Sequence, residues 1–343
     1  MTLPEHIETE AELDDWMTRP SDALVEFAAG LRGPLVVLGA GGKMGPSLCV
    51  LARRAAEATG RELEVVAVSR FSDAGAQAWL EGRGVRTVAC DLLADDLGAL
   101  PDAENVVYLV GLKFGTAQAP ARTWAVNTLV PARVAERYAG ARTVALSSGN
   151  VYPLVPANSG GSREADALTP LGEYANACVA RERIFQYGSE RWGVPGVLVR
   201  LNYATDLRYG VLVDLAQTVA AGQPVDVTMG FLNCIWQRDA NDAALRALAL
   251  AETPMRPLNV TGTERLSVRA LAERIGDLMR RPVEIVGEEA PTALLSDTSR
   301  MVEALGPPPT PLDAVLRWTA DWVASGRPTL GKPTHFEVRD GRY

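Results

Sequence analysis

A run of glycines after the first strongly apolar segment is the clearest chemical feature of this sequence. Gly39, Gly42 and Gly45 are spaced GxxGxxG, directly after the apolar run Leu35–Leu38 and before an amphipathic stretch. In such a loop the first glycine permits a tight turn, the second lets the backbone approach a pyrophosphate, and the third lets a helix pack closely on a strand. Amides at the helix N-terminus add positive potential. The loop therefore indicates a dinucleotide site, and a purely structural turn is the alternative. The expected cofactor contacts from this loop are Gly39, Gly41, Gly42, Lys43, Met44 and Gly45.

The tip of the second expected strand decides which dinucleotide the sequence favours. An NAD site usually carries a carboxylate about 20 residues past the glycines, where it binds the ribose 2′-hydroxyl. Here Ser69 and Arg70 occupy that place. Arg70 and Lys43 could both reach a 2′-phosphate, and a guanidinium offers it paired donors. We therefore expect NADP in preference to NAD, with Arg70 as an ordinary solvated charge as the alternative. Asp91 and Leu92, after the third strand, are expected to flank the adenine.

Composition argues against several other kinds of chemistry. The chain has 42 acidic and 34 basic side chains and a net charge of −8, which disfavours nucleic-acid binding. No apolar run approaches the ~18–20 residues of a membrane helix, and the acidic N-terminus is unlike a signal or transit peptide. With only two histidines and no CxxC pair, no metal site is expected. We expect a cytoplasmic protein with free thiols and a small-molecule substrate, without nucleic-acid or membrane partners.

The elements that must position this chemistry follow an alternating pattern. The expected strands are the apolar runs at 35–38, 63–68, 87–89, 106–110, 143–146 and 197–199. The expected helices between them are at about 44–59, 73–83, 119–139 and 170–193. Strands that are apolar on both faces and separated by helices are typical of a parallel sheet covered on both sides. The predicted fold class is α/β, a doubly wound parallel (Rossmann) sheet with a smaller, discontinuous C-terminal substrate lobe.

The domain organisation expected from this pattern has four parts. Residues 1–30 form a helical extension, and 31–201 form the dinucleotide-binding domain, to which 232–260 return. Residues 202–231 and 261–326 form the substrate lobe. Residues 327–343 form an extended tail that either folds over the cleft or contacts another subunit. The C-terminal half is expected to contain helices at 211–221, 239–252, 267–280 and 312–325 and strands at 225–229, 232–236, 258–260 and 283–286.

Several short motifs occur in an order and spacing that together resemble one enzyme family. They are GAGGKMG at 39–45, CDL at 90–92, VVYLVGLKFG at 106–115, Asn127 within WAVNTLVPA, SSGNVYP at 147–153, Tyr174 in EYANAC, RLNYA at 200–204, RDANDAALRAL at 238–248 and NVTGTERLSVRALAERI at 259–275. Over residues 34–326 the chain resembles the extended short-chain dehydrogenases/reductases, the NAD-dependent epimerase/dehydratase group. The resemblance implies further cofactor contacts at Val110, Gly111, Lys113, Asn127 and Tyr174.

The resemblance also implies a Ser–Tyr–Lys catalytic site, of which two members are present. Ser148 matches the catalytic hydroxyl and Tyr174 the tyrosine of a YxxxK motif, but Cys178 stands where the lysine is expected. Bringing a phenol of pKa ~10 near 7 requires about 4 kcal/mol of selective anion stabilisation, which a neutral thiol cannot supply. Lys113 is the main candidate for the missing charge, because its GLK triplet resembles a cofactor-proximal loop of UDP-galactose 4-epimerase. Arg181 and the absence of any replacement are the alternatives.

We expect Tyr174 to protonate an alkoxide or enolate as hydride arrives, with Ser148 donating a hydrogen bond to the carbonyl oxygen. Aromatic packing and a satisfied strand-end hydroxyl are the alternatives for these two residues. A tryptophan face together with amide and hydroxyl donors suits a carbohydrate ring or sugar acid, although each such residue could be an ordinary loop residue. The expected substrate contacts are Ser148, Gly149, Asn150, Asn202, Tyr203, Arg208 and Trp236.

Three functions are open at this point. The first is an NAD(P)-dependent oxidoreductase acting on a carbonyl or hydroxyl of a sugar-derived or similar polyhydroxy substrate. The second is a nucleotide-sugar epimerase or dehydratase with tightly bound NAD, and the third is a catalytically silent dinucleotide sensor or scaffold. The resemblance further implies a homodimer that pairs the helices at 119–139 and 170–193.

Overall fold

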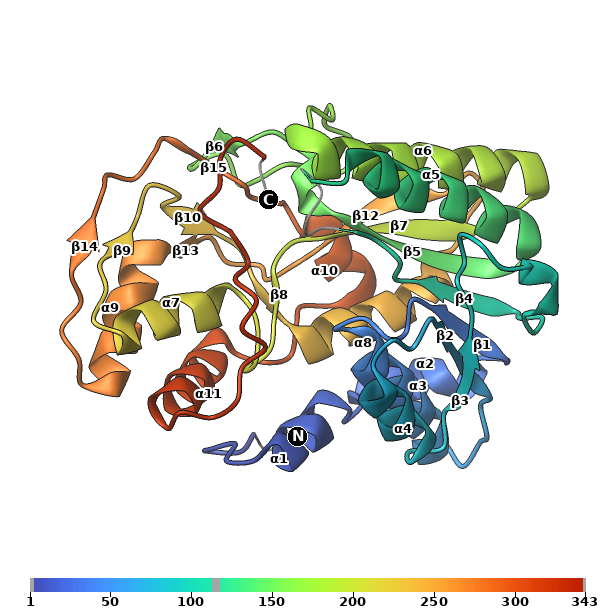
Figure 1. Cartoon of the computed structure of the whole chain (residues 1–343), viewed down its shortest axis with the longest axis horizontal. Helices are drawn as coiled ribbons and strands as arrows, with labels where there is room; N and C mark the ends of the chain where they lie inside the picture. The colour runs from blue at the N-terminus through green and yellow to red at the C-terminus, as the bar shows by residue number, and fades with distance from the viewer. Residues whose placement is uncertain (1–2, 113–117, 342–343) are drawn as a thin grey trace.

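The computed structural model describes residues 3–112 and 118–341. One of its two lobes is built around a seven-stranded parallel sheet (Figure 1). The strand order is β12-β7-β5-β4-β1-β2-β3, so the order reverses at β1, whose neighbours are β2 and β4. A crevice beyond the carboxyl ends of the strands at such a reversal is where ligands bind in open α/β sheets. The fold class predicted from the sequence is confirmed. The strands are β1 (Leu35–Leu38), β2 (Val65–Ser69), β3 (Arg86–Ala89), β4 (Asn105–Tyr108), β5 (Arg142–Ser148), β7 (Gly196–Leu201) and β12 (Arg256–Val260).

Helices cover both faces of the sheet because the central strands are apolar on both sides. In Figure 1, α5 (Pro120–Arg137) and α6 (Gly172–Trp192) lie together on one face. The other face is covered by α2 (Asp22–Gly30), α3 (Gly45–Ala58) and α8 (Gln237–Arg246). Two hydrophobic clusters, one on each face, contain alternate residues of the same strands, such as Val37 on one side and Val36 on the other. The remaining helices beside the sheet are α4 (Ala74–Glu81) and α10 (Ser299–Leu305), with the 3₁₀ turns η1 (Leu97–Ala99), η2 (Gly149–Val151) and η3 (Ala247–Leu250).

A second lobe lies at the left of Figure 1 and has its own apolar core. Three helices pack together in it: α7 (Val211–Ala220), α9 (Val268–Met279) and α11 (Leu312–Ala324). Short strands surround them and join the two lobes: β6 (Val155–Pro156), β8 (Ala204–Thr205), β9 (Val225–Asp226), β10 (Phe231–Leu232), β11 (Ile235–Trp236), β13 (Leu266–Ser267), β14 (Ile285–Val286) and β15 (Thr292–Ala293).

The strand expected at 232–236 is divided into β10 and β11. Asn233 lies between them, and its side chain donates to Glu264 O and accepts from Ser296 N. These contacts divert the backbone, so β10 pairs with β13 and β11 pairs with β8. The helix expected at 239–252 ends at Arg246 and continues as η3.

The N-terminal helix α1 (Glu10–Met17) joins the two halves of the molecule. Thr9 and Glu12 form a capping box at its start. The Asp14 carboxylate accepts from Trp79 Nε1 on α4 and from Arg208 Nη1 beside the second lobe, at 2.8 and 3.0 Å. Within residues 3–112 and 118–341, no helix combines the length and apolarity needed to cross a membrane.

Candidate functional site

The glycine loop connects β1 to α3 at the point where the strand order reverses. Gly39 has φ +86°, and a Cβ there would lie 3.0 Å from Val110 N. A Cβ on Gly41 would lie 2.6 Å from Ser69 Oγ, and one on Gly45 would lie 2.3 Å from Ala40 O. Larger residues therefore do not fit at these positions. No described side chain caps the start of α3, but Pro46 has no N–H and Gly45 N donates to Gly42 O at 3.3 Å, so few amides of the first turn are left for a ligand.

A cavity of about 270 Å³ opens beside this loop. Expected cofactor contacts from the ends of four different strands line this cavity. Arg122, at the start of α5, also lines it and was not predicted from the sequence. Arg70 is exposed on its wall, while the Asp91 carboxylate accepts from Leu93 N and shapes the turn after β3. The expected residues on the wall are Gly39, Gly41, Gly42, Ser69, Arg70, Asp91, Leu92, Val110 and Gly111.

Lys43 lies on the other side of the loop, away from Arg70. Its Nζ is 2.8 Å from the centre of the Tyr209 ring, and it lines a second cavity of about 170 Å³ with Met44. From behind, two amides of α8 support the loop: Gln237 donates to Lys43 O and Asn241 donates to Met44 O, both at 3.4 Å. These α8 contacts were not anticipated, because the spacing of residues in the chain does not reveal which helix packs behind the loop.

Ser148 and Tyr174 meet in this second cavity. Ser148 is the last residue of β5, and Tyr174 lies in the first turn of α6, which packs along β5. The Tyr174 phenol lies close enough to the Ser148 and Cys178 side chains for both to affect its pKa. The strand end and the helix start thus place both groups in one cavity with the tip of the glycine loop.

The surroundings of Tyr174 keep its phenol protonated at neutral pH. Burial raises the pKa of Tyr174 well above that of a free phenol, and the Cys178 thiol adds to the rise. The Arg181 guanidinium and the Ser148 hydroxyl oppose it. A thiol cannot carry a positive charge, so the buried Cys178 does not replace the lysine of the YxxxK motif electrostatically.

Arg181 supplies a buried positive charge next to this pair. It is only 4% exposed, and its guanidinium donates to Leu146 O at 2.6 Å and lies 3.5 Å from Cys178 Sγ. It also donates twice to Asn127 Oδ1, so the expected cofactor contact Asn127 is engaged by Arg181. Gly111 provides the room, since a Cβ there would lie 2.8 Å from Arg181 Nη2. Lys113, the main candidate for the missing charge, lies outside the described residues.

A buried polar network that was not predicted from the sequence lies beneath Ser148. Glu182 accepts from Arg200 at 2.9 and 2.7 Å and from Ser147 Oγ at 2.6 Å. Arg200 also donates to the Tyr152 hydroxyl, which donates to Asn259 Oδ1 at 2.9 Å. The network joins β5, α6, β7 and β12 and fixes the strand end that carries Ser148. Its members are far apart in the sequence, and no local motif connects them.

Some expected substrate contacts line the second cavity and others do not. Asn150, Asn202 and Tyr203 line it, and Gly149 packs against the Asn202 side chain. Arg208 is instead paired with Asp14 at 3.0 Å and Asp206 at 3.2 Å.

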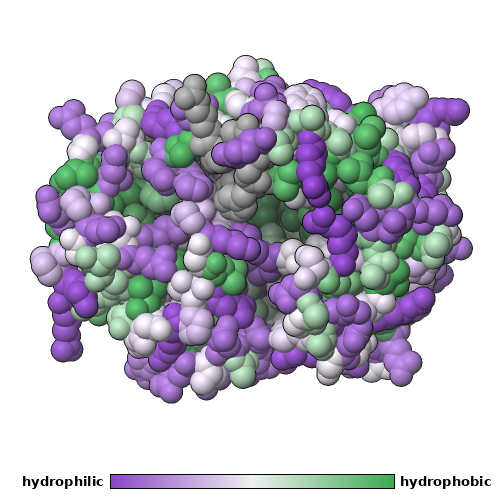
Figure 2. Space-filling model, in the orientation of Figure 1, coloured by the Kyte–Doolittle hydropathy of each residue, from purple (hydrophilic) through white to green (hydrophobic). Residues whose placement is uncertain are grey.

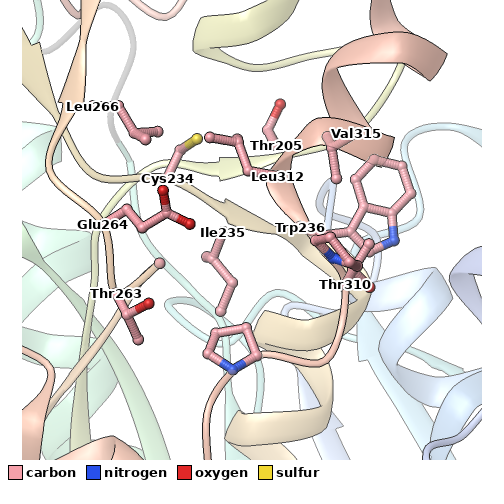
Figure 3. Close-up of a pocket in the computed structure, with 13 residues that line it drawn as sticks. Thr205, Cys234, Ile235, Trp236, Thr263, Glu264, Leu266, Thr310, Leu312 and Val315 are labelled. Atoms are coloured by element: carbon pink, nitrogen blue, oxygen red, sulfur yellow. The ribbon is translucent and has the colours of Figure 1, made fainter.

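Trp236 packs against Trp318 in the second lobe and lines a separate cavity of about 110 Å³ (Figure 3). Cys234 and Glu264 are also on the wall of that cavity, where burial raises the pKa of the Cys234 thiol to about 12. The thiol is therefore unreactive at neutral pH. No group of three His, Cys, Asp or Glu side chains suited to a metal ion is found in the described part of the chain.

Comparison with known proteins finds similar folds among solved structures but no match by sequence. No family model matches the sequence, and no curated protein matches it. Among solved structures, the UDP-glucose 4-epimerase of Thermotoga maritima with UDP-glucose is 15% identical with a TM-score of 0.69, covering 85% of this chain and 99% of that one. The UDP-glucuronic acid 4-epimerase of Bacillus cereus, in complex with UDP-glucuronic acid and NAD, is 16% identical with a TM-score of 0.69 and the same coverage. At these identities the likeness shows a shared fold.

Proposed function

We propose that this protein is an NAD(P)-dependent oxidoreductase that acts on a carbonyl or hydroxyl group of a small polyhydroxy compound, with Tyr174 as proton donor and acceptor. The observation that carries the proposal is the placement of Ser148 and Tyr174 in one cavity with the tip of the glycine loop. A hydroxyl donor, a phenol and a phosphate-binding loop at a sheet reversal are the parts that hydride transfer to a carbonyl requires.

The residues around the loop fit a dinucleotide. Gly39, Gly41 and Gly45 leave little room for a Cβ, and the loop and the N-terminal end of α3 would lie against a pyrophosphate. The 270 Å³ cavity would hold the adenosine half, between the ends of β1, β2, β3 and β4. When bound, the dinucleotide supplies a hydride or accepts one.

Tyr174 transfers the proton, and Ser148 stabilises the reacting oxygen of the substrate. With its pKa raised, Tyr174 is a neutral phenol that donates its proton to an oxygen on which negative charge develops. Ser148 donates a hydrogen bond to the same oxygen. The buried Arg181 cation favours the phenolate that remains, because it lies behind Cys178 and Tyr174 with uncharged hydrogen-bond acceptors around it. We propose that Arg181 takes the electrostatic part of the lysine that Cys178 replaces.

Arg70 supports NADP as the preferred cofactor. It lies exposed on the wall of the adenosine cavity beside Ser69, at the strand end where an NAD site usually carries a carboxylate. A guanidinium there would pair with a 2′-phosphate. NAD is the alternative, because the Bacillus cereus neighbour was solved with NAD.

A nucleotide-sugar 4-epimerase is the second candidate, and the neighbours in the structural comparison favour it. An epimerase returns the hydride to the same substrate molecule. It would retain its cofactor through purification and consume no added NADPH or NADH.

The exposed face of α5 and α6 supports a homodimer. Trp124 and Leu129 on α5 are 38% and 55% exposed, and Tyr187 on α6 is 58% exposed. The two helices also make extensive contact with each other, so together they offer one broad surface.

The proposed function is tested by substituting Phe for Tyr174. Protein loaded with NADPH, and separately with NADH, is mixed with a panel of aldoses, sugar lactones and keto sugar acids, and single-turnover loss of the reduced cofactor is recorded. We expect Tyr174→Phe to slow hydride transfer about 10²–10⁴-fold. Tyr187→Phe, an exposed position on the same helix, is the control and should leave the rate unchanged. An unaltered rate in Tyr174→Phe would remove the phenol from the mechanism.

A further inference from the structure

The chain that follows α11 returns across the mouth of the cleft between the two lobes. In Figure 1 it is the red segment that climbs from α11 past β8 and β10 to β6 and β15. On the second lobe, Thr329 Oγ1 accepts from Gln217 Nε2 on α7 at 3.0 Å, and Leu330 N donates to Arg208 O at 2.9 Å. Thr334 then donates through its amide and its hydroxyl to Asp214 Oδ2 on α7, at 2.8 and 2.6 Å. We name residues 334–341 the C-terminal strap.

The outer half of the strap is held at three points. Phe336 is 7% exposed and belongs to the apolar core of the second lobe. Arg339 donates to Thr292 O and Thr292 Oγ1 at 2.8 and 2.7 Å. At its end, Gly341 lies against the backbone of Leu171 and Gly172, where a Cβ on Gly341 would be 2.3 Å from Leu171 O. The strap therefore extends from the second lobe to the first residue of the helix that carries Tyr174.

The strap forms part of the wall of the cavity in which Ser148 and Tyr174 lie. Thr334 lines that cavity directly. Val338, Arg339 and Gly341 face Asn150 and Tyr203 across an adjoining space of only about 20 Å³. Figure 2 shows the same face of the molecule, which is hollowed near its centre with hydrophobic residues visible inside.

The space that remains is small compared with known ligand sites. Pockets for drug-sized ligands enclose ~300–1,000 Å³, whereas the cavity beside Tyr174 encloses about 170 Å³. Its described lining includes the amides of Asn150, Asn202 and Gln237 and the hydroxyls of Ser148 and Thr334. These groups suit a single polyhydroxy ring or chain. Strap residues line the space that adjoins this cavity, so a nucleotide that extended from such a ring in that direction would meet the strap.

We propose that the C-terminal strap sets the size limit of the substrate, so that the protein acts on a small free polyhydroxy carbonyl or hydroxy compound and excludes nucleotide-linked sugars. This inference rests on the proposed function for the reaction, and it separates this chain from the neighbours described with UDP-sugars. Those neighbours align over 99% of their length with only 85% of this chain, so this chain contains segments without a counterpart in them.

The strap is tested by binding of UDP-glucose, measured by calorimetry in the full chain and in a variant that ends at Phe336. This deletion removes the contacts at Arg339 and Gly341 but keeps the buried Phe336. We expect no binding of UDP-glucose to the full chain at millimolar concentration and a gain of about tenfold or more in affinity in the shortened chain. Arg339→Ala removes the contact between Arg339 and Thr292 without a deletion. If the shortened chain does not fold, UDP-glucose binding by Arg339→Ala is compared with that of the full chain instead. The matched control is Arg327→Ala, whose side chain pairs with Asp321 outside the cleft.

Three outcomes would overturn the proposal: tight UDP-glucose binding by the full chain, equal binding by both chains, or binding by neither. In the last case something other than the strap excludes the nucleotide. NADPH and NADH are titrated into the same samples. If neither NADPH nor NADH binds, the proposed function is contradicted. The UDP-glucose titration tests the role of the strap independently of that result.

Discussion

Two arginine side chains are buried beneath the cleft, and they differ in how their charges are balanced. Arg200 on β7 contacts both carboxylate oxygens of Glu182, at 2.9 and 2.7 Å, and is 2% exposed. Arg181 on α6 is 4% exposed, and its hydrogen-bond acceptors are the Asn127 amide, the Leu146 carbonyl and the Cys178 sulfur. No carboxylate among the described residues lies within ion-pair distance of Arg181.

The difference separates a structural charge from one that acts on its surroundings. The Arg200 charge is cancelled within its own pair, and the pair serves to join β5, α6 and β7. The Arg181 charge is not cancelled locally, so its field reaches Tyr174 and opposes the rise in its pKa. A buried cation without a counter-ion is costly, and the proposed role for Arg181 gives it a function beside the proton donor.

The largest effect is expected from breaking the balanced pair. Glu182→Gln leaves the Arg200 guanidinium buried without its counter-charge, which should lower the free energy of unfolding by about 3–5 kcal/mol. Denaturant unfolding monitored by circular dichroism measures this, with Glu190→Gln on the exposed side of the same helix as the control. A loss no larger than in the control would show that the pair does not hold the strands together.

Removing the unbalanced charge should act on chemistry more than on stability. Arg181→Gln takes away the cation that lowers the pKa of Tyr174, so that pKa rises further. In oxidation the phenolate is the base, and the increase of rate with pH should therefore move to higher pH. We expect about a 10²-fold slower oxidation at neutral pH. The measurement is the pH profile of single-turnover oxidation with the substrate found in the panel.

Arg181→Lys keeps a positive charge and should recover part of the rate, while Arg183→Gln on the exposed side of α6 should have no effect. A purely structural role for Arg181 would lower activity without displacing the pH profile. That outcome would remove the distinction drawn between the two arginines.

A smaller effect is expected from restoring the lysine of the YxxxK motif. Cys178→Lys would place a second cation beside the Arg181 guanidinium, which lies 3.5 Å from the present sulfur. Like charges this close in a buried site should cost about 2 kcal/mol of stability, measured by denaturant unfolding. Combining it with Arg181→Ala removes the repulsion, so the double variant should be more stable than the sum of the two single effects predicts. Simple additivity would indicate that the two positions do not share one charge site.

Much of the frame could be predicted from the sequence, because it depends on local patterns. Apolar runs at 35–38 and 143–146 predicted β1 and part of β5, and the glycine spacing predicted a loop that the structure places where the strand order reverses. Ser148 and Tyr174 were expected together because the resemblance placed them on adjacent elements. The absence of a lysine at position 178 was also evident from the sequence.

The proposal that Arg181 takes the electrostatic part of that lysine depends on the tertiary structure. Arg181 lies about two helical turns beyond Tyr174, so by its position in the chain it is remote from the phenol. Helical side chains point toward the N-terminus of their helix, and a long arginine reaches back over the preceding turn to Cys178. Asn127 and Gly111 complete its site from other elements.

The strap and the buried network depend on tertiary structure for the same reason. Arg339 meets Thr292, and Glu182 meets Arg200, only when distant parts of the chain pack together. The sequence by itself determined the elements and the groups able to do chemistry, because spacing along the chain fixes turns and faces. Only the tertiary structure decided which charges are cancelled, which remain effective and how much space is left for a substrate, because these depend on contacts between residues that are far apart in the chain.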